Sequence, residues 1–114
     1  MTSQPKRVRM TLPTITVLDV LANAAGEDIH GLEIGSRAHL GTGTVYPMLS
    51  RLEKAGMVSA RWEDDQTWQE ASDKEWRPRR RYYEITGAGK AALAQARQSK
   101  AQYRPGIVQP GSAS

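Results

Sequence analysis

The chain has 114 residues, which suffices for one domain with a modest hydrophobic core and is too short for two. It contains no cysteine, which excludes disulfides and thiolate metal sites, and it has no apolar run long enough to span a membrane, so we expect a cytoplasmic protein. The formal net charge is +4, and the basic residues gather near the N-terminus and at residues 77–81, which favours a polyanionic partner.

The first half of the chain predicts a basic arm followed by two helices. Residues 1–10 are polar and basic, and we expect a flexible arm there. A first helix is expected from Thr11, a good N-cap residue, with Pro13 in its first turn and Gly26 beyond its end. A short second helix is expected at about residues 30–39.

A third helix is predicted at about residues 43–55, with Thr42 as its N-cap. Its apolar residues follow the spacing of one buried helix face: Val45, Met48, Leu49 and Leu52. Pro47 lies close to the start of this helix, where its missing N–H removes at most one helical hydrogen bond. We interpret the proline as marking the beginning of an exposed, functional surface.

Two strands follow, at residues 57–62 and 80–85, and their composition predicts a two-stranded hairpin. About 15 residues between them, rich in Asp and Glu, are expected to form a long loop. Trp62 and Trp76 are expected to pack on the hairpin and Trp68 to be exposed, while Tyr82 and Tyr83 should face opposite sides. Thr86 can cap a last helix, which gives residues 86–104 as helix and 105–114 as a disordered tail.

This order of elements predicts a winged helix-turn-helix, mostly α with a two-stranded β wing (α+β), over residues 11–85. In such domains the third helix enters the major groove of DNA and meets base edges. Its outer face should carry short hydrogen-bonding groups and cations, because phosphates surround it. The residues of this helix outside the buried face have that character and are our DNA-binding candidates: Thr42, Gly43, Thr44, Tyr46, Pro47, Ser50, Arg51 and Lys54.

Three stretches together resemble the PadR-like family of bacterial transcriptional regulators: "HGLEI" at residues 30–34, "GTGTVYPMLSRLEKAGMVSARW" at 41–62 and "RPRRRYYEITGAGKAAL" at 77–93. The resemblance implies a homodimeric winged-helix protein that binds a double-stranded DNA operator and usually represses a nearby promoter. It adds the wing residues Arg79, Arg80 and Arg81 as candidates. The segment at residues 63–78 is longer and more acidic than the wing usual in that family.

The last helix is predicted to serve dimerisation, together with the first. The expected dimer-interface residues lie in the apolar stripes of these helices: Leu18, Leu21, Leu93 and Ala96. Some small members of the family bind aromatic ligands through a Trp on the last helix. This chain has no Trp there, which argues against a small-molecule effector at that place and leaves the existence of an effector open.

No catalytic triad, phosphate-binding loop or paired carboxylates are found, so an enzyme is not expected, and neither is a cofactor. His30 and His39 stand alone in sequence and make a poor metal site. Two alternatives to the operator-binding regulator stay open at this point. One is a winged-helix module that binds another protein, and the other is a plasmid- or phage-type DNA-organising protein with little sequence preference.

Overall fold

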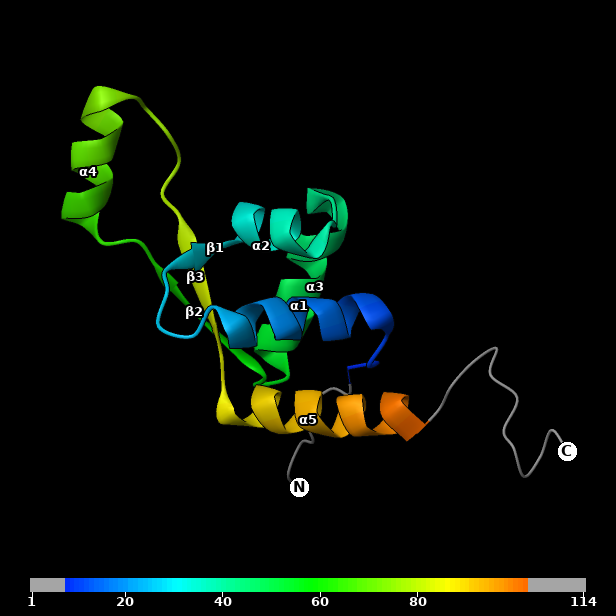
Figure 1. Ribbon diagram of the computed structural model, residues 1–114. Helices are drawn as coiled ribbons and strands as arrows, with labels where there is room; N and C mark the ends of the chain where they lie inside the picture. The colour runs from blue at the N-terminus through cyan, green and yellow to red at the C-terminus, as the bar shows by residue number, and fades with distance from the viewer. Residues whose placement is uncertain (1–7, 103–114) are drawn as a thin grey trace, which may run out of the picture.

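A computed structural model describes residues 8–102 of the chain (Figure 1). The elements in order are α1 (Leu12–Asn23), β1 (Ile29–His30), α2 (Gly31–Ala38), α3 (Thr42–Lys54), β2 (Val58–Trp62), α4 (Asp65–Lys74), β3 (Arg81–Ile85) and α5 (Gly87–Gln102). The strands form one antiparallel sheet in the order β1-β3-β2. This arrangement confirms the predicted winged helix-turn-helix.

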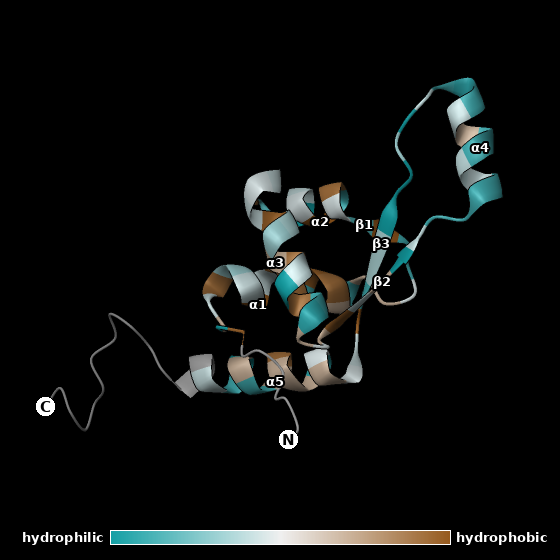
Figure 2. Ribbon diagram, turned by 180° about the vertical axis from the view of Figure 1, so that it is seen from behind, coloured by the Kyte–Doolittle hydropathy of each residue, from teal (hydrophilic) through white to brown (hydrophobic). Residues whose placement is uncertain are grey.

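The hydrophobic core lies where α1, α2 and α3 meet the sheet and α5. The hydropathy colouring of Figure 2 shows apolar segments on these elements and a mostly hydrophilic α4. Burying each large aliphatic side chain contributes roughly 1.5–3 kcal/mol, so this single cluster holds the helices against the sheet. Its fully buried large members are Val17, Leu18, Leu21, Ile29, Ile34, Val45, Leu49 and Leu52.

The turn between α2 and α3 fixes how the two helices cross. His39 ends α2 in the left-handed conformation, with φ 58°, and the Leu40 amide donates to the Gly35 carbonyl oxygen at 2.8 Å. A Cβ at Gly35 would lie 2.8 Å from the Leu40 carbonyl oxygen, so a larger residue would force the turn open. Glycine at position 35 therefore allows the close turn into α3.

The wing differs from its prediction in two ways. The expected loop contains α4, which is capped by Asp64 accepting a hydrogen bond from the Thr67 amide at 2.9 Å. No residue of α4 is buried, so its sequence lacks the apolar periodicity that would have indicated a helix. A third strand, β1, was also missed because two residues are too few to show a pattern. In Figure 1, α4 stands apart from the other helices.

The start of the described chain also corrects the expected flexible arm. Val8 and Met10 pack against the core, so the arm does not include residues 8–10. Residues 1–7, with Lys6 and Arg7, and the predicted tail at 105–114 lie outside the described residues. Within residues 8–102, no helix combines the length and apolar character needed to cross a membrane.

Three of the four residues expected at a dimer interface are fully buried within one chain, Leu18, Leu21 and Leu93, whereas Ala96 lines an open hollow beside α5. The first and last helices pack against each other within the chain, and an ion pair between Asp19 and Arg97 also joins them. Leu18, Leu21 and Leu93 therefore fill the core of one subunit, whereas the dimer contact expected of Ala96 stays a prediction.

Candidate nucleic-acid interface

Helix α3 divides into a buried and an exposed face, as predicted. The four expected core residues are buried: Val45, Met48, Leu49 and Leu52. All eight predicted DNA-binding positions of the helix are exposed: Thr42, Gly43, Thr44, Tyr46, Pro47, Ser50, Arg51 and Lys54. The structure therefore brings these eight candidates together on one accessible surface, which we call the α3 face.

The N-terminus of α3 is open to solvent. The helix begins at Thr42 with Gly41 as its N-cap, one residue earlier than predicted, and no side chain caps it. A Cβ at Gly41 or Gly43 would meet no atom within 4 Å, so neither glycine is required by packing inside the protein. The free amides and the positive dipole end of a helix attract anions, and small residues let a partner's backbone approach closely.

Pro47 is the sixth residue of α3, so its ring faces the carbonyl of Gly43 four residues earlier. The helix continues through it to Lys54. The residue that meets the ring is a glycine in the first turn, so the lost hydrogen bond and the crowding stay at the end of the helix. The exposed ring is part of the α3 face.

Tyr46 lies across the start of α2. A Cβ built on Gly31 would lie 2.4 Å from a ring carbon of Tyr46, closer than any real contact. Glycine at position 31 therefore leaves the space that the tyrosine ring occupies, which explains one residue of the "HGLEI" motif. Sequence reasoning missed this contact, because Gly31 and Tyr46 lie 15 positions apart in the sequence, on different helices.

The charge of the α3 face is favourable to a polyanion. Glu53 lies beside this face and is the only acid of α3. The Arg81 guanidinium pairs with its carboxylate at 3.0 Å. Arg81 also lies over the Trp62 ring, 4.9 Å from its centroid. Within the described part of the chain, Arg51 and Lys54 form no ion pair. The face therefore offers cations whose charge no neighbouring carboxylate offsets.

The three wing arginines have different surroundings. Arg79 pairs with Asp65 and lies over the Trp68 ring, and Arg81 is held by Glu53 as described. Arg80 is half-buried and, among residues 8–102, has no carboxylate partner for its side chain. Of the three candidates, Arg80 alone has a guanidinium that forms no ion pair in the described chain, although its backbone amide contacts the Glu63 carboxylate.

The tryptophans of the wing are arranged opposite to the prediction. Trp68 is half-buried, and its indole N–H donates to the Arg77 carbonyl oxygen at 2.7 Å. Trp62 and Trp76, expected to pack on the hairpin, are 57% and 72% exposed. The reason is α4, which includes Trp68 and places its ring against Arg77 and Arg79, in the segment that precedes β3. Tyr83 is buried and Tyr82 half-exposed, so the predicted split of the tyrosine pair is confirmed.

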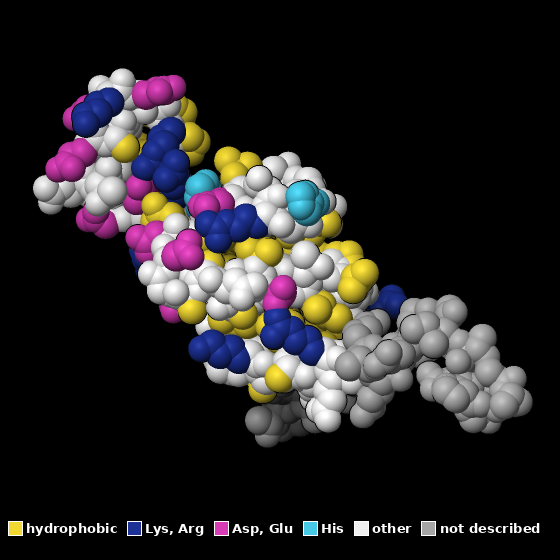
Figure 3. All heavy atoms as spheres, viewed as in Figure 1, with side chains coloured by type: hydrophobic (Ala, Val, Ile, Leu, Met, Phe, Trp, Pro, Cys, Tyr) yellow, Lys and Arg dark blue, Asp and Glu magenta, His cyan; other side chains and the backbone are white. Residues whose placement is uncertain are grey.

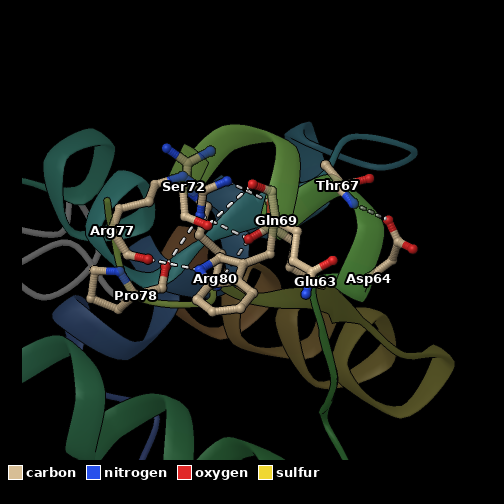
Figure 4. A network of polar contacts seen from close by, with 9 residues as sticks. Glu63, Asp64, Thr67, Gln69, Ser72, Arg77, Pro78 and Arg80 are labelled. Carbon is tan, nitrogen blue, oxygen red and sulfur yellow. Dashed lines mark hydrogen bonds and ion pairs between the residues drawn. The ribbon is translucent and has the colours of Figure 1, made fainter. Parts of the chain in front are cut away.

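The carboxylate of Glu63, at the end of β2, is hydrogen-bonded to Arg77 and Arg80 on the opposite side of the wing (Figure 4). Glu63 is 3% exposed and accepts two hydrogen bonds from the Arg77 guanidinium, at 2.8 and 2.6 Å, and one from the Arg80 amide at 3.2 Å. The Arg77 guanidinium lowers the pKa of Glu63 from 4.5 to about 2, against the opposing effect of burial. We call this pair the wing lock. Nothing in the spacing of the two residues indicates it.

Comparison with known proteins identifies the family. The model of the transcriptional regulator PadR-like family matches residues 17–95, which is more than half of the chain. The chain belongs to this family. No curated protein matches the sequence. Membership places this PadR-like chain among the transcriptional regulators, which are DNA-binding proteins rather than enzymes.

Solved structures support the same fold. A PadR family transcription regulator from Clostridium difficile is 24% identical, with a TM-score of 0.64, over 81% of this chain and 90% of that one. A PadR-like transcriptional regulator from Bacillus cereus is 21% identical, with a TM-score of 0.57, over 82% and 88%. The PcaV transcriptional regulator from Streptomyces coelicolor, solved in complex with its natural ligand, is 22% identical, with a TM-score of 0.56, over 92% and 68%.

Proposed function

We propose that this PadR-like protein is a homodimeric repressor that binds a pseudo-palindromic operator through the α3 face. The observation that carries the proposal is the composition of that face. It presents hydroxyl groups, a tyrosine and two cations without an ion-pair partner in the described chain, while the only acid of the helix is held by Arg81. Short donors and cations on an exposed helix suit both base edges and phosphates.

Within the α3 face the residues have separate proposed roles. Thr42, Gly43 and Thr44 lie at the helix N-terminus, where amides and hydroxyls suit a phosphate. Tyr46, Ser50 and Arg51 lie further along the exposed face and are the proposed base-reading residues. Lys54 and the wing arginine Arg80 are proposed to contact phosphates on either side.

The proposed dimer uses the outer surfaces of α1 and α5, because their apolar stripes already fill the core. An open apolar hollow of about 310 Å³ lies beside α5 and is lined in part by Met10, Met57 and Ala92. To read a pseudo-palindromic operator, the two α3 helices of the proposed dimer must reach successive major grooves, about 34–36 Å apart. Sedimentation equilibrium of the purified protein tests the dimer, and a monomer at micromolar concentration would contradict it.

Selection from random DNA duplexes tests the proposed function. A dimeric reader should enrich an inverted repeat whose half-sites are separated by about one helical turn. Enrichment without a consensus would instead indicate a DNA-organising protein. The salt dependence of the affinity distinguishes binding to DNA from binding to another protein. Affinity for DNA should fall by orders of magnitude between about 50 and 200 mM salt if several phosphates are neutralised. A module that binds only proteins would enrich no duplex at all.

A further inference from the structure

The first residue of α2 lies under the side chain of Tyr46 in α3. Gly31 is buried, and the atoms of Tyr46 nearest to a Cβ built on it are Cε1, Cζ and the hydroxyl oxygen. All three atoms belong to the outer end of the tyrosine side chain. Figure 3 shows hydrophobic side chains at the surface beside α2, and Tyr46 is 42% exposed. The phenol end of Tyr46 therefore rests on Gly31, while part of its ring stays open to a partner.

The backbone at position 31 does not itself require glycine. Among the described residues, the glycines with a positive φ are Gly26 and Gly56, so Gly31 has a φ that any residue adopts. Glycine also destabilises a helix relative to alanine, because it loses more backbone entropy on folding. What glycine supplies at this position is space, and the atoms that occupy the space belong to Tyr46.

The direction of the Tyr46 side chain is set by packing. Its hydroxyl group forms no hydrogen bond within residues 8–102. The hydroxyl is therefore available to a partner outside the described chain. Because no hydrogen bond orients it, the surface on which the ring rests decides where the hydroxyl points.

We propose that Gly31 is a positioning residue for DNA recognition, which sets operator specificity by holding the Tyr46 phenol where it meets a base edge. This inference rests on the proposed function, because it concerns a side chain of the α3 face. A Cβ at position 31 would lie 2.4 Å from Cε1, so the ring would have to move by about 1.0 Å to reach the 3.4 Å of an ordinary contact. Groups that recognise a partner have to be held within roughly 0.5 Å of their productive geometry. Such a shift would therefore lose the contact made by Tyr46.

The position of the ring is tested without DNA, by nuclear magnetic resonance on the free protein. A nuclear Overhauser cross-peak between the α-protons of Gly31 and the ring protons of Tyr46 is expected, because the ring lies in the direction of the missing Cβ. The internal control is Gly89, whose missing Cβ points in the same way at the Ile85 side chain. A spectrum with the Gly89 cross-peak and without that of Gly31 would overturn the proposed placement.

A double-mutant cycle tests whether Gly31 acts through Tyr46. Tyr46→Ala should weaken binding of the selected operator about five- to 150-fold, as for the loss of one good base contact. Gly31→Ala should weaken it by a factor within about threefold of that. In the Tyr46→Ala background, Gly31→Ala should change the affinity less than about twofold, whereas independent effects would multiply. A loss that persists without the tyrosine, or no loss with it, would overturn the inference.

The matched control for the cycle is Gly87→Ala. Gly87 is also the first residue of a helix, and a Cβ there meets no atom within 4 Å, so its affinity should equal that of wild type. Thermal melts check the fold of each variant. Gly31→Ala should melt close to wild type, because the atoms that must yield are the far end of an exposed side chain. Unfolding of this variant would make Gly31 a structural residue and overturn the positioning role.

Selection from random duplexes supplies a readout that a structural defect would not move. Gly31→Ala should lose its base preference at the operator position where Tyr46→Ala loses it, and keep the preference elsewhere. A uniform loss at all positions would overturn the specificity role. If wild type selects no operator, or Tyr46→Ala binds it unchanged, the proposed function of this face fails and the role of Gly31 fails with it. A loss in Tyr46→Ala with none in Gly31→Ala refutes the inference alone.

Discussion

Replacing Glu63 with Gln should remove a pH-dependent part of the stability. The Arg77 guanidinium holds the pKa of Glu63 at about 2 instead of 4.5, so the charged form is favoured in the folded protein. A carboxyl group with a lowered pKa stabilises the fold above its unfolded pKa, and this contribution is lost as the pH falls from 4.5 towards 2. At about 1.4 kcal/mol for each pH unit between the two values, the contribution reaches at most about 3 kcal/mol.

Urea unfolding followed by circular dichroism measures this contribution. Between about pH 7 and about pH 3, the wild type should lose about 2 kcal/mol more unfolding free energy than Glu63→Gln does. Glu84→Gln is the matched control, because Glu84 is an exposed glutamate of β3 without an ion pair in the described chain, and it should follow the wild type. Equal pH dependence of wild type and Glu63→Gln would refute the stabilising role of the wing lock.

Three further predictions concern the backbone. Gly89→Ala should destabilise by several kcal/mol in a thermal melt, because the new Cβ would lie 2.1 Å from the Met57 carbonyl oxygen, whereas Gly87→Ala, which meets nothing within 4 Å, should not. Gly43→Ala should raise the unfolding free energy by about 0.5–1 kcal/mol yet weaken operator binding, and unchanged binding would argue against close approach of DNA there. Pro47→Ala should stabilise the fold by about 1 kcal/mol or more in urea unfolding, because it restores an N–H to α3, and a loss of stability would contradict this account of the proline.

The parts of the structure that follow a periodic pattern could be predicted from the sequence. The buried face of α3 was found because Val45, Met48, Leu49 and Leu52 repeat at helical spacing, and the exposed candidates followed as the remaining residues. The capped start of α1 was found for a similar reason, since Thr11 accepts a hydrogen bond from the Thr14 amide and Pro13 lies in the first turn. Such signals depend only on residues that are close in sequence, so they can be recognised without knowledge of the tertiary contacts.

The parts that depend on contacts distant in sequence could not be predicted. Glu63 and Arg77 pair across the segment that contains α4, and Gly31 makes room for Tyr46 from another helix. Helix α4 was missed because none of its residues is fully buried, so its sequence lacks an apolar face that would have indicated a helix. Leu18, Leu21 and Leu93 were assigned to a dimer interface but are buried within one chain. An apolar stripe indicates that a helix face is covered, and it does not indicate whether the same chain or a partner covers it.

The most direct test of the central claim is the affinity of Arg51→Ala for the selected operator, measured by fluorescence anisotropy beside wild type and the control Arg37→Ala. Arg37 is also an exposed helical arginine, but it lies on α2 and pairs with Glu27 and Glu33. If the α3 face binds the operator, Arg51→Ala should weaken binding by about 1–3 kcal/mol, roughly five- to 150-fold, and Arg37→Ala should stay within about twofold of wild type. Equal affinities of wild type and Arg51→Ala would contradict the assignment of this face to DNA.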